Sequence, residues 1–215
     1  MATDSARDPA AGPQPEDLRE RLIAAGLGVL DADGPAELTV RRIAEAAGSS
    51  TMGVYTKFGG RAGVLEAIYR RGFDLLRVAL GAVPEAGDPI AHIVDLALAY
   101  RRFALANGAL YAFMFERPVP DFDPGPGLRR EALDTTFGLL VAAVRQATAQ
   151  GALPDVDAVR TSYLVWCVVH GMVSLELTHA VRSPLPGWFL DSAEAGERIL
   201  LDGVRATLEG LRRLS

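Results

Sequence analysis

The stretch that decides the fold covers residues 38–68 and reads LTVRRIAEAAGSSTMGVYTKFGGRAGVLEAI. Its first half predicts two short helices, because Thr39 is a good N-cap for one and Ser50 is a good N-cap for the other. Gly48 ends the first helix where a left-handed cap is favoured, and Gly59-Gly60 ends the second. Two short helices joined by a tight turn that contains glycine are typical of a helix-turn-helix.

The second of these helices has two different faces. Val54 and Phe58 are four residues apart and can pack on the apolar positions of the first helix. Thr51 and Tyr55 are also four apart, so they lie side by side on the opposite, outer face. In a helix-turn-helix the second helix enters the major groove of DNA. We therefore expect this outer face to contact DNA.

The charge of this stretch differs from that of the whole chain. The 215 residues carry 22 Lys+Arg against 27 Asp+Glu, a net charge of −5, which excludes a generic basic nucleic-acid coat. Between residues 39 and 61, however, four basic residues face one acid, Glu45, which gives a local charge of +3. Phosphate neutralisation needs such a patch and does not need a basic protein. The basic residues are Arg41, Arg42, Lys57 and Arg61.

Outside this stretch, apolar spacing and Pro/Gly breaks predict only helices. One helix runs from residue 16 to about 30 and another from 61 to about 80, before a break at 83–89. No segment shows sustained two-residue alternation, so we expect an all-α fold. Further helices are predicted near 89–106, 108–117, 125–150, 155–182 and 190–213. The predicted parts are a disordered arm (1–15), a three-helix helix-turn-helix domain (16–81) and a larger C-terminal helical domain (88–215).

Composition excludes several protein classes. With 49% hydrophobic residues the chain can fill a core and is not disordered. The single Cys167 forms no internal disulfide, and the isolated histidines show no metal-ligand spacing, so we expect no metal, no cofactor and no enzyme. The start lacks the apolar core of a signal peptide, and the longest apolar run, Tyr163–Val169, is too short to span a bilayer. We expect a soluble cytoplasmic protein.

The last two predicted helices suggest a partner chain. The helix over 155–182 is apolar around its whole circumference at Tyr163–Val169, so it must be covered on every side. The helix over 190–213 has a narrower apolar stripe and could complete a four-helix bundle between two subunits. One recognition helix reads only a few base pairs, whereas a two-fold dimer uses two half-sites. We therefore expect a homodimer on a palindromic double-stranded operator.

Several residues of the opening stretch match a known family pattern. They are Leu38-Thr39, Ile43-Ala44, Ala47-Gly48, Ser50, Tyr55, Phe58 and Arg61. By these residues, positions 16–80 resemble the DNA-binding domain of the TetR family. The resemblance implies that one group of residues contacts phosphates: Thr39, Ser50, Tyr55, Lys57 and Arg61. Arg41 lies in the same basic patch and is a further candidate for DNA contact. A second group would lie nearest the base edges: Thr51, Met52, Gly53 and Thr56. Ser49, Gly53 and Arg61 depart from the usual pattern and leave the operator sequence open.

The C-terminal part carries a second resemblance. Trp166, His170 and Gly171 form W-x-x-x-H-G, which resembles the C-terminal domain of a TetR subgroup named for Trp-His-Gly. The resemblance implies a mostly apolar effector pocket. Its predicted lining is Tyr100, Phe103, Tyr111, Phe115, Trp166 and His170. The alternative is that all six are ordinary core residues, with His170 bonded to a backbone carbonyl or to Glu176.

These resemblances imply a repressor that leaves its operator when a small apolar ligand enters the C-terminal domain. The ligand would shift the helix over 61–80 and so change the spacing of the two recognition helices. Two alternatives remain. One is a DNA-binding regulator without an effector, in which the C-terminal core is closed. The other is an enzyme built on a helical bundle, which the absence of paired metal ligands does not favour.

Overall fold

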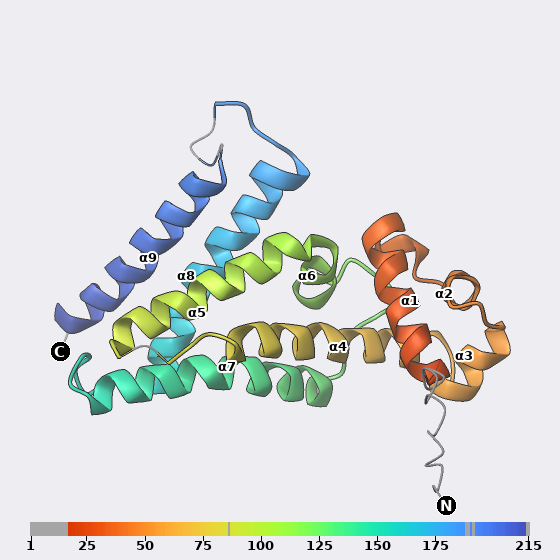
Figure 1. Cartoon of the computed structure of the whole chain (residues 1–215), viewed down its shortest axis with the longest axis horizontal. Helices are drawn as coiled ribbons and strands as arrows, with labels where there is room; N and C mark the ends of the chain where they lie inside the picture. Colours follow the sequence, from red (N-terminus) through yellow and green to blue (C-terminus); the bar gives the residue numbers. More distant parts are fainter. Residues whose placement is uncertain (1–16, 86, 188–189, 191, 214–215) are drawn as a thin grey trace, which may run out of the picture.

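The computed structural model of the chain describes residues 17–85, 87–187, 190 and 192–213. These residues form helices and connecting turns, and no strand occurs among them, which confirms the predicted all-α fold. Figure 1 shows a small group of helices, α1 to α3, at one end of the molecule, followed by a larger helical part. The predicted disordered arm, residues 1–15, lies outside the described residues.

Local signals in the sequence begin and end the helices of the smaller part. Asp17, Thr39 and Ser50 are the N-caps, and each accepts a hydrogen bond from a backbone N–H in the first turn of its helix. Gly59 ends the third helix with a φ of 74°, a left-handed conformation that costs glycine little. The elements are α1 (Leu18–Asp33), η1 (Pro35–Glu37), α2 (Val40–Ala46) and α3 (Thr51–Phe58).

Helix α4 (Arg61–Gly81) takes part in both halves of the molecule. Its N-terminal half buries Val64, Leu65 and Ile68 against α1 and α3. Its C-terminal half buries Leu76 and Leu80 in the larger part, where α4 packs on α5, α6 and α7. One continuous helix of 21 residues therefore contributes side chains to both cores.

After α4, the described residues of the larger part form five α-helices and one π-helical turn. Helix α8 packs on α9, α7 and α5, and Figure 1 shows α8 and α9 side by side at the end of the molecule opposite α1 to α3. Helix α6 ends at Phe115, two residues earlier than expected, because Arg117 adopts a left-handed φ of 52° that breaks the helix. The elements are α5 (Pro89–Ala106), α6 (Gly108–Phe115), α7 (Pro126–Ala149), α8 (Ala158–Glu176), the π-helical turn η2 (Leu177–Arg182) and α9 (Ala193–Arg213).

Helix α8 with η2 differs from the sequence-based view in one respect. Over Ala158–Arg182 it is long and apolar enough to cross a membrane by length and composition, although the apolar run Tyr163–Val169 alone is too short. A core helix passes the same test, so a single such helix is weak support for a membrane span. In this fold α8 packs against three other helices of the chain.

Candidate DNA-binding surface and ligand cavity

Helix α3 presents one face outward and buries the other. Val54 is fully buried, and Phe58 is partly buried with the guanidinium of Arg19 5.3 Å from its ring centre. Met52 and Tyr55 are 68% and 55% exposed. Other predicted contact residues on the exposed surface are Arg41, Thr51, Thr56 and Lys57. The outer face therefore places polar and aromatic side chains together where a duplex could approach.

Two predicted phosphate-contacting residues already have a role inside the fold. The hydroxyl oxygen of Thr39 accepts from the backbone N–H of Arg42 at 3.2 Å, and that of Ser50 accepts from Gly53 at 3.3 Å. A hydroxyl carries one donor as well as its acceptor lone pairs. Both side chains can therefore cap their helices and still donate to a phosphate oxygen.

The basic patch is partly neutralised by acids that lie outside the stretch. The guanidinium of Arg42 pairs with Asp33 at 2.9 Å, and the Nζ atom of Lys57 lies 3.6 Å from Asp17. Arg61 donates from Nε to the carbonyl oxygen of Leu38 at 2.8 Å, which ties α4 to the segment before α2. The local charge of +3 counted along the sequence therefore overstates what α2 and α3 offer to DNA.

Gly53 faces the protein and not the open surface. A Cβ at this position would lie 2.6 Å from the Oγ atom of Ser49 and 3.4 Å from a methyl of Leu18. Glycine thus lets α3 pack closely on the turn and on α1. A side chain at position 53 would point toward Ser49 and Leu18, so this position has a packing role in addition to its predicted place near the base edges.

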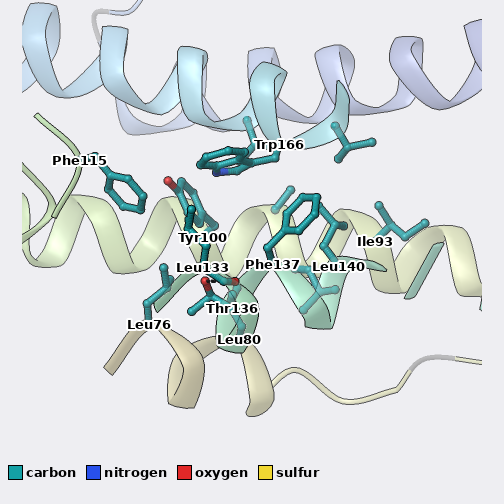
Figure 2. Close-up of a pocket in the computed structure, with 14 residues that line it drawn as sticks. Leu76, Leu80, Ile93, Tyr100, Phe115, Leu133, Thr136, Phe137, Leu140 and Trp166 are labelled. Atoms are coloured by element: carbon teal, nitrogen blue, oxygen red, sulfur yellow. Dashed lines mark hydrogen bonds between the residues drawn. The ribbon is translucent and has the colours of Figure 1, made fainter. Parts of the chain in front are cut away.

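A mostly apolar cavity of about 50 Å³ lies among α4, α5, α6, α7 and α8. Figure 2 shows Tyr100, Phe115 and Trp166, three of the six predicted ligand-contacting residues, in its wall. The cavity is larger than one water needs but well below the roughly 300–1,000 Å³ of typical ligand sites. The remaining lining residues are Leu76, Leu80, Ile93, Leu96, Ala97, Leu133, Thr136, Phe137, Leu140, Val165 and Val169.

Tyr111 and His170 lie behind Tyr100 and form a hydrogen-bonded cluster with it. The Nδ1 atom of His170 is 2.8 Å from the hydroxyl of Tyr100 and 2.7 Å from that of Tyr111. The alternative in which His170 bonds to a backbone carbonyl or to Glu176 is wrong in its choice of partner, because the Nδ1 atom contacts two tyrosine hydroxyls and Glu176 is paired with Arg101. Burial raises the pKa of Tyr100 to about 12 and lowers the pKa of His170, so the cluster is uncharged near pH 7.

Phe103 lies outside the cavity wall. It is buried in the core, three residues after Tyr100 toward the end of α5, and it is not among the residues that line the cavity. The sequence had also missed the contribution of α7, above all Phe137, whose ring centre lies 6.0 Å from that of Trp166. An aromatic residue in an amphipathic helix is usually part of the ordinary core. The only sequence signal for a place in the cavity wall was the helical spacing that puts Phe137 on the same face as Leu133 and Leu140.

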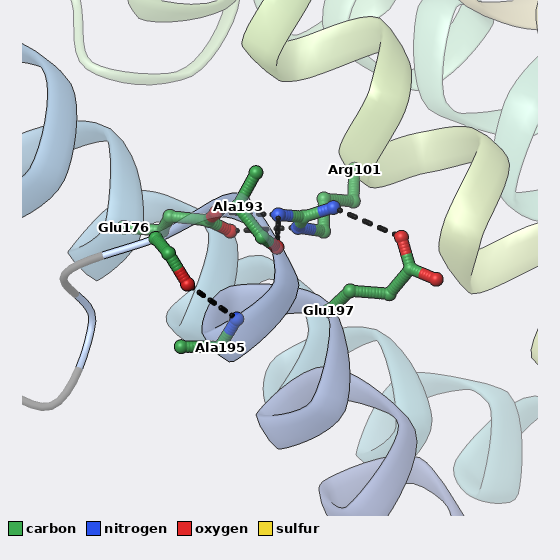
Figure 3. A network of polar contacts seen from close by, with 6 residues as sticks. Arg101, Glu176, Ala193, Ala195 and Glu197 are labelled. Carbon is green, nitrogen blue, oxygen red and sulfur yellow. Dashed lines mark hydrogen bonds and ion pairs between the residues drawn. The ribbon is translucent and has the colours of Figure 1, made fainter.

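A second polar cluster was also missed. Arg101 donates to both carboxylate oxygens of Glu176, at 2.8 and 2.6 Å, and to the carbonyl oxygen of Ala193 at 2.6 Å (Figure 3). Both charged side chains are about 5% exposed. Glu176 raises the pKa of Arg101, chiefly through this hydrogen bonding. The pair ties α5 to α8 and to the first residues of α9. Its signal in the sequence was a charged residue within a mostly apolar stretch of each helix, Arg101 in α5 and Glu176 in α8.

Comparison with known proteins assigns the family. Residues 22–68 match the model described as bacterial regulatory proteins, tetR family, and residues 93–202 match the tetracyclin repressor-like C-terminal domain. No curated protein matches the chain significantly.

Solved structures show the same fold. A protein of unknown function from Rhodococcus sp. RHA1 is 27% identical, with a TM-score of 0.75 over 93% of this chain and 100% of that one. A putative TetR family transcription regulator from Shewanella sp. PV-4 is 18% identical, with a TM-score of 0.66 over 89% and 98%. The fatty acid degradation regulator FadR from Bacillus halodurans is 16% identical, with a TM-score of 0.71 over 93% and 99%. The chain belongs to the TetR family and is a DNA-binding transcriptional regulator.

Proposed function

We propose that the protein is a cytoplasmic repressor that binds a palindromic operator as a homodimer and leaves it when a small apolar effector enters the C-terminal cavity. One observation carries the proposal: α4 has Val64 and Leu65 in the core of the α1–α3 group and Leu76 and Leu80 at the cavity. A ligand that widens the cavity pushes directly on the helix that holds the recognition helix in place.

The DNA contact is assigned to the outer face of α3. In this proposal the phosphate contacts come from Tyr55, Lys57, Thr39, Ser50 and Arg61. The hydrogen bond of Arg61 to the Leu38 carbonyl favours an indirect, structural contribution for this residue. The base edges would be contacted by Thr51, Met52 and Thr56, because these side chains are exposed on α3. Arg41 is the cation of the patch that is most available to DNA, since its side chain is exposed and forms no ion pair with the described residues.

The homodimer is supported by apolar side chains that this single chain leaves uncovered. Tyr163, Leu164 and Leu175 of α8 are 55%, 39% and 54% exposed, although the helix is apolar on all sides. Helix α9, which packs on α8, would supply the other pair of helices of a four-helix interface. A two-fold arrangement of this kind would place two α3 helices on successive half-sites.

Release by an effector requires that the ligand bind one conformation better than the other. The close packing of α4 on α6 supports a mechanical link, because Gly72 of α4 leaves no room for a Cβ beside Met114. Phe115, the next residue of α6, lines the cavity. The small volume of the cavity favours a second candidate, a regulator without an effector, and ligand binding separates the two.

The experiment that tests the proposal is an electrophoretic mobility shift with the DNA that flanks the gene, at two salt concentrations. The wild type should give a specific shift that weakens with salt, because phosphate contacts release counterions. Tyr55→Ala should weaken binding about tenfold or more, in line with the loss of about 1–3 kcal/mol for a strong contact at a protein–DNA interface.

The matched control is Val78→Ala, an exposed apolar side chain on α4 that lies outside α3. It should leave the shift unchanged. If the wild type retains no specific DNA from the flanking region or from a random-sequence selection, the regulator role of α3 is wrong.

A further inference from the structure

The cavity carries polar atoms at only a few places. Of its fourteen lining side chains, only those of Tyr100, Thr136 and Trp166 contain nitrogen or oxygen. The hydroxyl of Thr136 is engaged with its own helix, since it lies 3.3 Å from the carbonyl oxygens of Ala132 and Leu133. The Tyr100 hydroxyl and the Trp166 indole N–H are therefore the groups that a ligand can reach, and the indole N–H, which interacts with the Tyr100 hydroxyl, would exchange that partner for the ligand. Figure 2 shows them close together, on α5 and α8.

The hydroxyl of Tyr100 is not fully used within its cluster. One ring nitrogen of His170 has either one lone pair or one N–H, so it cannot accept the protons of both Tyr100 and Tyr111. The remaining contact, from the hydroxyl of Tyr100 to that of Tyr111, is 3.3 Å long, compared with about 2.7–2.8 Å for a good O–H···O bond. In either ring tautomer at least one hydroxyl proton therefore lacks a short acceptor.

The cavity wall offers no charged group to a ligand. No charged side chain lines the cavity, and the charged residues beside the cluster, Arg182 and Glu116, are paired with each other by two hydrogen bonds of 2.8 Å. Burial lowers the pKa of His170, so the ring carries no charge near pH 7. A carboxylate in the cavity would lose its hydration without gaining a cation, and that loss strongly disfavours it.

We propose that the effector is an apolar molecule with one uncharged hydrogen-bond-accepting oxygen, as in a ketone, ester or alcohol, and that Tyr100 and Trp166 donate to this oxygen. Tyr111 and His170 act as positioning residues that hold the Tyr100 hydroxyl at the end of the cavity. The inference rests on the proposed function, in which the cavity takes the effector. It adds a chemical class: the oxygen is neutral, and the rest of the molecule is apolar.

Entry of such a molecule requires the cavity to widen. Phe137 and Trp166 are both partly exposed and face each other between α7 and α8, so their separation would open the cavity toward solvent. The test accordingly uses small probes of equal chain length: 2-hexanone, 1-hexanol, hexanoate and n-hexane. Trp188→Phe leaves Trp166 as the only tryptophan, since the sequence has two. Binding is then followed by its fluorescence and by calorimetry.

The expected result is a preference for the two neutral oxygen compounds. 2-Hexanone and 1-hexanol should bind about fivefold or more tightly than n-hexane and hexanoate, the ratio given by one net hydrogen bond. Tyr100→Phe should abolish that preference and leave n-hexane binding intact. Two control variants should keep the preference for the neutral oxygen compounds. In Thr136→Val the lost hydroxyl is one that bonds to the carbonyl of Ala132 in its own helix. Tyr69→Phe changes a buried tyrosine that packs on Phe73, Phe113 and Phe122 and lies outside the cavity wall.

The outcomes separate this inference from the proposed function. Hexanoate binding as tightly as 2-hexanone, or an unchanged preference in folded Tyr100→Phe, overturns the assignment of a neutral oxygen to Tyr100. Binding of n-hexane without any preference overturns the inference and leaves an apolar effector standing. No saturable binding by any probe overturns both the inference and effector release, whereas the mobility shift tests DNA binding independently.

Discussion

Two polar clusters join α5 to α8 from neighbouring residues, Arg101 and Tyr100, and they differ in charge and in completeness. Arg101 and Glu176 form a buried ion pair with two hydrogen bonds, and Arg101 also donates to the Ala193 carbonyl. The cluster of Tyr100, Tyr111 and His170 is uncharged and keeps one long contact of 3.3 Å. The hydrogen bonds of the Arg101–Glu176 pair are all short, whereas the tyrosine–histidine cluster keeps one long hydrogen bond that a ligand could replace.

The difference shows how one pair of packed helices can be rigid and adaptable at once. A buried charge must keep its partner, because an unpaired charge away from water is strongly destabilising. A buried hydroxyl can change partners at a cost of about 1 kcal/mol. We therefore interpret the ion pair as the fixed connection of α9 to α5 and α8, and the tyrosine–histidine cluster as the adaptable side of the cavity.

Glu176→Ala should give the largest loss of stability. It leaves the guanidinium of Arg101 buried without its main partner, so the free energy of unfolding should fall by about 3–5 kcal/mol, measured by urea denaturation. Glu197→Ala is the matched control, since Glu197 contacts the same guanidinium at 3.5 Å from a half-exposed position and should cost less than about 1 kcal/mol. Replacing both Arg101 and Glu176 by Met should restore most of the loss. Equal effects of Glu176→Ala and Glu197→Ala would contradict the buried pair.

Gly196→Ala should give the second largest effect. A Cβ at Gly196 would collide with the carboxylate of Glu176, which Arg101 prevents from moving aside, so we expect a loss of about 1–3 kcal/mol in the same assay. Gly210→Ala in the same helix has open space around the new Cβ and should stabilise by up to about 1 kcal/mol. In a Glu176→Ala background the cost of Gly196→Ala should vanish. A persistent cost there would place the clash elsewhere.

Tyr111→Phe probes the neutral cluster and should cost less. The variant removes one hydroxyl and lets Tyr100 take the single lone pair of His170, so the unfolding free energy should fall by about 0.5–1.5 kcal/mol. Thermal and urea denaturation measure it. A loss as large as that of Glu176→Ala would mean that the two clusters are equally rigid.

The pH dependence of stability should give the smallest effect. Burial lowers the pKa of His170 in the folded state below its usual 6.5, so protonation favours the unfolded state. Stability contributed by the neutral ring is present above pH 6.5 and decreases as the pH falls below it. Urea denaturation from pH 8 to 5 should show this decrease in the wild type and a smaller one in His170→Phe. His92→Gln, whose ring contacts the Pro84 carbonyl at 3.1 Å, is the control.

The sequence alone determined the positions of the helices. Thr39, Ser50 and Gly59 cap α2 and α3 where the sequence predicts it, and the apolar spacing predicts α4 and α5 to within a residue. These signals are reliable because a cap or a turn depends on residues within one helical turn of each other. The family pattern in residues 38–68 was readable for the same reason, since it lies within one continuous segment.

Tertiary structure alone decided which residues meet. Arg101 and Glu176 are 75 residues apart, and nothing in the spacing of either helix indicates the other. Likewise Tyr100 and Tyr111, and not Glu176, are the partners of His170, and Phe137 of α7 lines the cavity beside Trp166. Periodicity tells which face of a helix is buried. The neighbour on that face depends on how the helices cross and pack, and this is decided only when the whole chain has folded.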